Sequence, residues 1–208
     1  MEEEIIIQKA LEISKKEFKK YENKINPAHC FDHTERVFSL CKKILTFHKD
    51  ADRLVVLVAA AFHDIGRIKD DYGRHEVWSK EITSNFFEND DKFKKIEEGR
   101  KEKILYIIEH HSDLDEKNTK GLKAQDEFKI VVDADRIDSF GPIGIIRASL
   151  DERYQKSAKE QLKHIKDKSE IDNFSLNSLG GQQIGEEFKM YLSEFMEKYE
   201  RQEKIGEL

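Results

Sequence analysis

Apolar residues recur at intervals of three and four positions along most of the chain, which is the spacing of one face of an α-helix. The pattern is clearest on three faces: Ile7, Ala10, Leu11, Ser14, Phe18 and Tyr21; Val37, Leu40, Cys41, Ile44 and Leu45; and Ile184, Phe188, Tyr191, Phe195 and Tyr199. No segment shows the convincing alternation of a half-buried strand, and the short run KIVVD at 129–133 fits a buried helix equally well. The pattern therefore predicts an all-α fold of about eight helices.

Glycine, proline and small polar residues mark where these helices should end. The first 65 residues contain no glycine, so the early breaks are expected at 26–27 and 50–52. The later breaks are expected at 70–73, 89–91, 112–121, 141–142 and 180–181. No internal repeat or low-complexity tract divides the chain, and 208 residues suit one domain of medium size.

Composition and charge exclude several classes of partner. The chain has 37 basic and 43 acidic residues, well interspersed, and no basic arm that would bind long nucleic acid. No run approaches the length of a membrane span, and the acidic start MEEEIII lacks the basic region of a signal peptide. Cys30 and Cys41 alone cannot build a disulfide framework or a thiolate metal cluster. We expect a cytoplasmic protein that binds no membrane.

One apolar run is followed directly by two ionisable residues, which a helix of the apolar core does not need. Residues 54–62 are almost all aliphatic or small, and His63 and Asp64 follow at once. Buried charges are usually paired or bound to metal, although a helix cap at the surface is the simpler alternative for each such residue alone. Five predicted helices carry similar groups: His33; His63 and Asp64; His75; His110 and His111; Asp133 and Asp135. Together these ligand types favour divalent Mn, Fe, Co, Ni, Zn or Mg.

Three segments that contain these residues resemble the motifs of a known protein family. The stretches HCFDHTERV, AAAFHDIGR and DADRID, in this order, resemble the HD-domain superfamily of metal-dependent phosphohydrolases over about residues 29–150. DADRID followed by GPIGIIRAS resembles its branch of small, stand-alone phosphohydrolases, some of which cleave nucleoside triphosphates. The resemblance implies one HD-type domain over residues 1–208, with C-terminal helices packed on the motif-bearing core.

The resemblance also implies a set of metal ligands. These are His33, His63, Asp64 and Asp135, which match the helix His, the adjacent His-Asp pair and the distant Asp of the superfamily. Asp135 is chosen over Asp133 because it directly precedes Arg136, as the last ligand of the family usually precedes a basic residue. Asp133 is the fallback ligand. It is expected instead to accept a hydrogen bond from the ring nitrogen of a ligating histidine that does not face the metal.

The family's reaction suggests roles for further residues. A metal lowers the pKa of its bound water and screens the phosphate charge, and Asp64 could also orient or deprotonate that water. Basic residues beside the metal would hold phosphate oxygens. Arg67 and Lys69 are the best placed, and Arg36, Arg74 and Arg147 are further substrate-binding candidates, although most of the 37 basic residues only solvate the surface.

His75, His110 and His111 leave two alternatives open. In binuclear branches of the superfamily, extra histidines after the His-Asp pair bind a second metal; otherwise they contact the substrate phosphate or line the pocket. The segment HHSDLD is not followed by the Gly-Tyr-Pro signature of cyclic-dinucleotide phosphodiesterases, which disfavours that activity. We prefer a mononuclear site in which these histidines bind substrate.

The expected function is hydrolysis of a small phosphorylated metabolite, a nucleotide in the first place. One alternative is a di-iron HD-fold oxygenase, which would need the extra histidines as ligands. The other is a regulatory module that binds a nucleotide without turnover.

Overall fold

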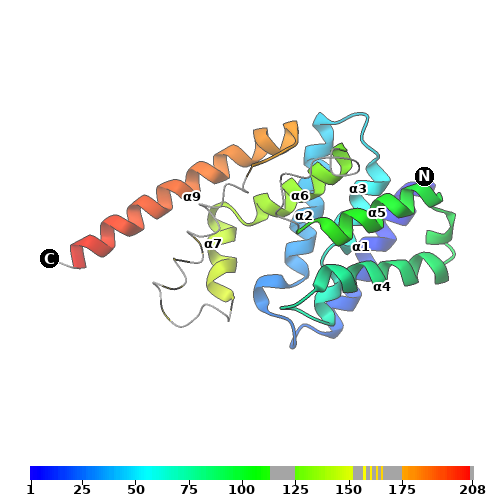
Figure 1. Ribbon diagram of the computed structural model, residues 1–208, viewed down its shortest axis with the longest axis horizontal. Coiled ribbons are helices and arrows are strands. Elements are labelled where there is room, and N and C mark those ends of the chain that lie inside the picture. The colour runs from blue at the N-terminus through cyan, green and yellow to red at the C-terminus, as the bar shows by residue number, and fades with distance from the viewer. Residues whose placement is uncertain are drawn as a thin grey trace.

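The computed structural model describes residues 1–112, 125–151 and 175–206, with Ser157, Glu160, Lys163 and Ile165 as single residues between the last two ranges. This part of the chain contains eight α-helices and four short 3₁₀-helices but no β-strand (Figure 1). The α-helices are α1 (Glu2–Lys20), α2 (Phe31–Ile44), α3 (Arg53–Phe62), α4 (His75–Asn89), α5 (Glu98–His110), α6 (Asp126–Asp138), α7 (Gly141–Leu150) and α9 (Leu179–Gly206). The 3₁₀-helices are η1 (Pro27–His29), η2 (Leu45–Phe47), η3 (Ile65–Ile68) and η4 (Phe93–Lys95). The all-α fold predicted from the sequence is confirmed.

Helix α3 forms the centre of the core. Its residues 54–62 are each at most 1% exposed, and it packs against α1, α2, α5 and α6. Asp52 begins the helix, because its Oδ1 accepts hydrogen bonds from the backbone N–H groups of Leu54 and Val55. A helix that is apolar on all sides must be surrounded by other elements. The last turn of α3 therefore delivers His63 and Asp64 to the interior of the protein.

Helices α2 and α6 pack side by side in opposite directions. His33 of α2 lies opposite Asp138 of α6, and Cys41, two turns further along α2, lies opposite Ile130. Both helices also pack against α3. The long helix α9 lies across α6 and α7, and its C-terminal half extends away from the other labelled helices (Figure 1).

The breaks expected at 141–142 and 180–181 have different outcomes in the structure. Residues 141–142 begin α7, and Gly141 has a positive φ of 65°. Residues 180–181 do not end a helix but lie in the first turn of α9. A Cβ at Gly181 would lie 2.2 Å from Asp133 Oδ2, so glycine is needed there for close approach. The break expected at 112–121 lies outside the described residues, except for Ser112.

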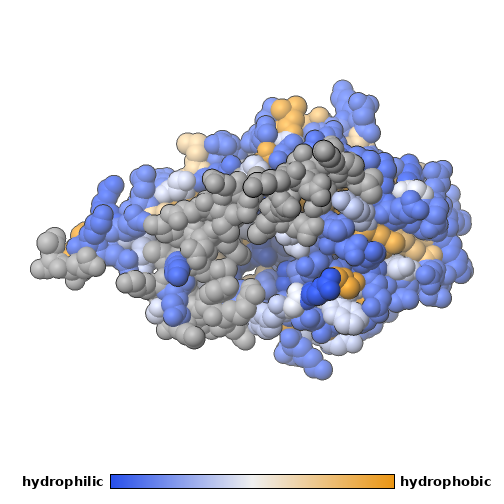
Figure 2. Space-filling view, in the orientation of Figure 1, coloured by the Kyte–Doolittle hydropathy of each residue, from blue (hydrophilic) through white to orange (hydrophobic). Residues whose placement is uncertain are grey.

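The surface shown in Figure 2 is mostly hydrophilic where residues are coloured, with apolar residues scattered among the polar ones. Of the helices that the structure describes, none combines the length and the apolar composition needed to cross a bilayer. Isolated apolar residues on a surface are normal and need no partner to explain them.

Candidate metal centre

Four side chains from three parts of the fold meet at the end of α3. His33 Nε2 lies 3.4 Å from His63 Nε2, 3.6 Å from Asp64 Oδ2 and 3.1 Å from Asp135 Oδ1. The side chains of His33, His63 and Asp64 are at most 2% exposed, whereas that of Asp135 is 28% exposed. The four residues that the sequence suggested as metal ligands thus lie together, with the solvent-accessible side at Asp135.

The orientation of three histidine rings is set by hydrogen bonds at Nδ1. His33 Nδ1 is 2.7 Å from the carboxylate of Asp138. The Nδ1 atoms of His63 and His111 lie 2.8 Å and 2.7 Å from the backbone carbonyl oxygens three residues earlier. Because carbonyl and ionised carboxylate oxygens only accept, each Nδ1 carries the hydrogen and Nε2 of the neutral ring keeps its lone pair. These Nε2 atoms all face the Asp64 carboxylate.

The protonation states also suit metal binding. Burial lowers the pKa of His63 to about 4, so this ring is neutral at physiological pH. Burial alone would raise the pKa of Asp64, but Arg67, His63 and His75 outweigh it and hold that pKa well below its usual range. The pKa of Asp135 is likewise lowered, because His33 outweighs the effect of burial. Neutral imidazole and ionised carboxylate are the forms that ligate metals.

Asp64 has one carboxylate oxygen that the described part of the chain leaves without a hydrogen bond. Its Oδ2 accepts a 2.6 Å hydrogen bond from Arg67 Nε. Its Oδ1 is buried and accepts no hydrogen bond from the described residues, although His75 Nε2 lies 3.0 Å away. A buried ionised oxygen without a donor is costly, and a cation held at this carboxylate, together with a water molecule at Oδ1, would offset that cost. The donor set therefore fits a divalent metal.

The ligand-type atoms form two overlapping sets. His33, His63 and Asp64 each offer one atom, and these atoms lie within 4.8 Å of one another. Asp64, His75 and His111 form a second set that meets the same limit. Asp64 is common to both, so its carboxylate lies between two places where an ion could be held.

The adjacent residues His110 and His111 have different surroundings. His111 is buried with its Nε2 3.6 Å from Asp64 Oδ1, and although burial lowers its pKa, Asp64 outweighs this effect and raises it. The His110 ring instead lies 4.4 Å from the ring of Tyr106, and its Nε2 is 3.6 Å from Glu109. Successive residues at a helix end point in different directions, so only His111 joins the cluster.

Gly66 allows the start of α4 to reach the cluster. A Cβ at this position would lie 2.1 Å from the His75 carbonyl oxygen and 2.4 Å from the backbone nitrogen of Ser79. The Gly66 N–H donates a 2.8 Å hydrogen bond to Ser79 Oγ. The glycine that follows the His-Asp pair in the sequence is therefore a packing requirement that brings His75 to Asp64.

Three of the five basic candidates lie at the cluster or directly behind it. Arg67 Nε binds Asp64, and its Nη2 is 3.3 Å from His75 Nε2. Arg36 Nε and Arg147 Nη1 bind Asp138, at 2.6 Å and 2.7 Å.

The other two basic candidates lie further away. Lys69 Nζ lies 4.4 Å from the centre of the Trp78 ring and 3.3 Å from Glu81. Arg74 is an exposed residue at the start of α4, where its backbone N–H donates to Asp70. Neither side chain has a described contact with the cluster.

The structure assigns different tasks to the aspartates of the DADRID segment. Contrary to our expectation, Asp133 does not support a histidine: its carboxylate accepts hydrogen bonds from Asn177 and Ser178, and so fixes the start of α9. Asp138, which our sequence reasoning missed, is the partner of His33. The available signal was its spacing of three from Asp135, which places both residues on one face of a helix.

The chain belongs to the HD-domain family, because the HD domain matches residues 30–140, which is more than half of its length. This confirms the resemblance noted in the sequence motifs. No curated protein matches the sequence.

Several solved structures share the fold along almost the whole chain. The Lin1889 protein of Listeria innocua is 25% identical, with a TM-score of 0.66 and 99% coverage of both chains. YpgQ of Bacillus subtilis, solved in complex with ADP, is 20% identical, with a TM-score of 0.66 and 97% coverage of both chains. An HD-superfamily hydrolase of Bacillus thuringiensis is 19% identical, with a TM-score of 0.67 and coverage of 97% and 98%.

Proposed function

We propose that this protein is a metal-dependent phosphohydrolase and that its substrate is a small phosphorylated metabolite, namely a nucleotide. The observation that carries the proposal is the buried Asp64 Oδ1, which accepts no described hydrogen bond while histidine Nε2 atoms surround it. Membership of the HD-domain family supports the hydrolase class. The complex of the related YpgQ with ADP supports a nucleotide as the ligand.

His33, His63, Asp64 and Asp135 would hold the divalent ion. When bound, the ion supplies a Lewis acid that lowers the pKa of a coordinated water and screens the charge of the phosphate. Asp64 Oδ2 faces His33 and His63 and would ligate the ion, while Oδ1, which lacks a described donor, accepts a hydrogen bond from the attacking water and orients it. Arg67 keeps Asp64 ionised and fixes the carboxylate through its Nε.

The remaining residues bind the substrate phosphate. His75 and His111 lie beside Asp64 Oδ1, and their Nε2 atoms, when protonated, donate hydrogen bonds to phosphate oxygens. The raised pKa of His111 favours this protonated form. Arg36 and Arg147 supply positive charge behind His33, where they also bind Asp138. Lys69, Arg74 and His110 have no described contact with the cluster, so we assign them no role in substrate binding.

A screen of phosphorylated metabolites tests this function. The full chain, freed of metal and reloaded with Mn, Mg, Co or Ni, is assayed for release of phosphate and pyrophosphate. We expect metal-dependent turnover of one or more nucleotides, and loss of both metal and turnover in His63→Ala and Asp64→Ala with helix content preserved. Turnover of long nucleic acid only, no turnover with any metal, or unchanged metal content in both variants contradicts the proposal.

The second set of ligand atoms favours one alternative, a di-iron oxygenase. Such an enzyme would be isolated with two irons per chain, would be coloured, and would consume oxygen with its substrate. A regulatory module would bind a nucleotide without releasing phosphate. Iron content, visible absorption and phosphate release therefore separate the three functions.

A further inference from the structure

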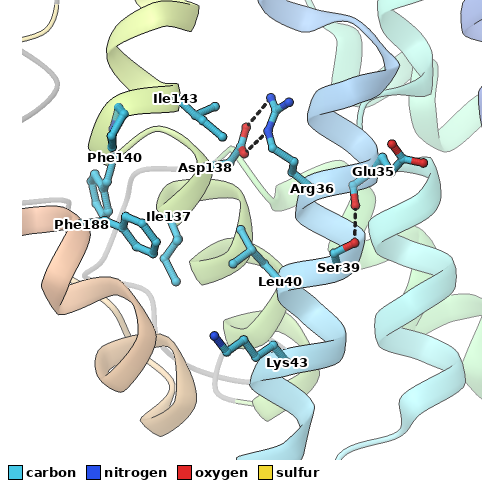
Figure 3. Close-up of a pocket in the computed structure, with 11 residues that line it drawn as sticks. Glu35, Arg36, Ser39, Leu40, Lys43, Ile137, Asp138, Phe140, Ile143 and Phe188 are labelled. Carbon is cyan, nitrogen blue, oxygen red and sulfur yellow. Dashed lines mark hydrogen bonds and ion pairs between the residues drawn. The ribbon is translucent and has the colours of Figure 1, made fainter.

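A pocket with a volume of about 570 Å³ lies between α2, α6, α7 and α9 (Figure 3). Sites for small molecules usually have volumes of roughly 300–1,000 Å³. The pocket contains none of the four proposed metal ligands, but Arg36 and Asp138 line it. The pocket therefore lies next to the proposed metal centre, but other residues line it.

The walls of the pocket suit a flat ring. Phe140 and Phe188 lie on one side, and Leu40 lies on the opposite side (Figure 3). Gly141 lets the Phe188 ring pack closely against the backbone at the start of α7, since a Cβ there would lie 2.8 Å from Phe188 Cδ1. A ring bound between aromatic and aliphatic side chains gains both apolar burial and stacking.

Positive charges lie at the two ends of the pocket. The guanidinium of Arg36 uses Nε and Nη2 to bind Asp138, at 2.6 Å and 3.1 Å, while Nη1 has no hydrogen bond to any described residue. Lys43 lies two turns further along α2 and forms no ion pair with the described residues (Figure 3). An anionic molecule with a ring system matches apolar walls between two cations.

Asp138 connects the pocket to the metal centre. The same carboxylate lines the pocket, binds Arg36 and accepts the hydrogen bond from His33 Nδ1. A molecule with its ring between Phe188 and Leu40 therefore meets Arg36 at the end nearest to the proposed metal ligands. Its charged group would lie at that end.

We propose that this pocket binds the base and sugar of the nucleotide substrate, with the phosphate chain extending past Arg36 to the metal centre. The inference rests on the proposed function, because it names the part of the protein that selects a nucleoside over other phosphate esters. Glu35 and Ser39 on the rim offer oxygen acceptors for N–H or O–H groups of the nucleoside.

Two matched pairs of variants test the pocket. Ile143 and Ile146 lie on the same helix and are 45% and 59% exposed, but only Ile143 lines the pocket. Ile143→Glu is compared with Ile146→Glu, and on α9 Phe188→Ala is compared with Tyr191→Ala. Binding of a fluorescent ADP, the N-methylanthraniloyl derivative, is titrated with and without Mn. Metal content and turnover of a nucleotide and of p-nitrophenyl phosphate are measured on the same proteins.

We expect Phe188→Ala to weaken binding of the fluorescent ADP roughly tenfold, the size of one lost stacking contact. Ile143→Glu should weaken it by a similar factor, because it places a carboxylate in a pocket for an anionic ligand. The preference of both variants for the nucleotide over p-nitrophenyl phosphate should fall by a similar factor through KM, with metal content unchanged. The two control variants should match the wild type. Equal ADP affinity in all five proteins, or no ADP binding by the wild type, overturns the inference even if p-nitrophenyl phosphate is hydrolysed. Selective loss of ADP binding without any turnover supports the pocket and contradicts the proposed hydrolase.

Discussion

His33 and Asp138 are joined by a 2.7 Å hydrogen bond across the α2–α6 interface. Burial alone would raise the pKa of Asp138, but His33 and Arg36 outweigh it and lower that pKa, with a further contribution from Arg147. An ionised carboxylate at Nδ1 fixes the tautomer of a ligating histidine and makes its Nε2 more basic. We therefore expect this pair to control how well His33 binds metal.

Asp138→Asn should weaken metal affinity by roughly ten- to a hundredfold, as is usual for partners behind metal ligands. Isothermal titration of metal-free protein with Mn or Zn measures the effect. Asp126→Asn is the matched control, because Asp126 is on the same helix, is 49% exposed and pairs with His48 at the surface. Equal affinities in the two variants would contradict the role of Asp138.

His111→Ala should reduce kcat/KM by roughly ten- to a hundredfold, the value of one charge-assisted hydrogen bond. His110→Ala should have a much smaller effect, because its ring lies against Tyr106. Metal measured per chain by mass spectrometry should stay near one in wild type and in both variants. A wild-type value near two that falls in His111→Ala would replace our mononuclear proposal with a binuclear one.

Gly66→Ala should destabilise the protein by about 1–3 kcal/mol or more, because the new Cβ would meet the backbone of α4. Gly99→Ala is the control: a Cβ there meets nothing within 4 Å, and alanine should raise helix stability by up to about 1 kcal/mol. Urea denaturation of both variants measures the difference. Similar unfolding midpoints would show that η3 and α4 do not need their close approach.

The stability of the metal-free protein should fall as the pH is lowered from about 6.5 to about 4. In this range the unfolded chain protonates His63, while the folded chain keeps it neutral, because burial lowers its pKa from 6.5 to about 4. The unfolded state then binds more protons, so stability rises with pH, by at most about 1.4 kcal/mol per pH unit for one group. Urea denaturation at several pH values should show a shallower dependence in His63→Gln. Parallel curves would contradict a buried neutral His63.

Cys41 should not react with Ellman's reagent in the native protein. It is fully buried, and burial raises the pKa of its thiol far above the usual value. Cys30 is partly exposed, so one thiol should titrate in the folded chain and two in denaturant. Cys30→Ser should abolish the native reaction, and a fast reaction that remains would show that Cys41 is accessible.

The sequence by itself determined the helical class and showed that residues 54–62 are apolar enough to lie in the core. Apolar spacing reports which residues of a helix are buried, so α2 and α9 could be recognised from their own residues. Residues 129–133 were undecided between strand and helix, since a short apolar run fits both. Their place in α6, beside α2 and α3, depends on contacts with distant parts of the chain. The extent of the domain, 1–208, stays a prediction.

The residue types and their order indicated a metal centre, because imidazole and carboxylate groups at the ends of apolar faces are costly without a ligand. Only the tertiary structure decided which of them meet. His33 and Asp138 are 105 positions apart, and no local pattern shows that Asp138 supports the ring while Asp133 fixes α9. The directions of adjacent side chains at a helix end likewise separate His111 from His110. The spacing of apolar and polar residues can be read from the sequence, whereas the partners of a side chain depend on how the helices pack.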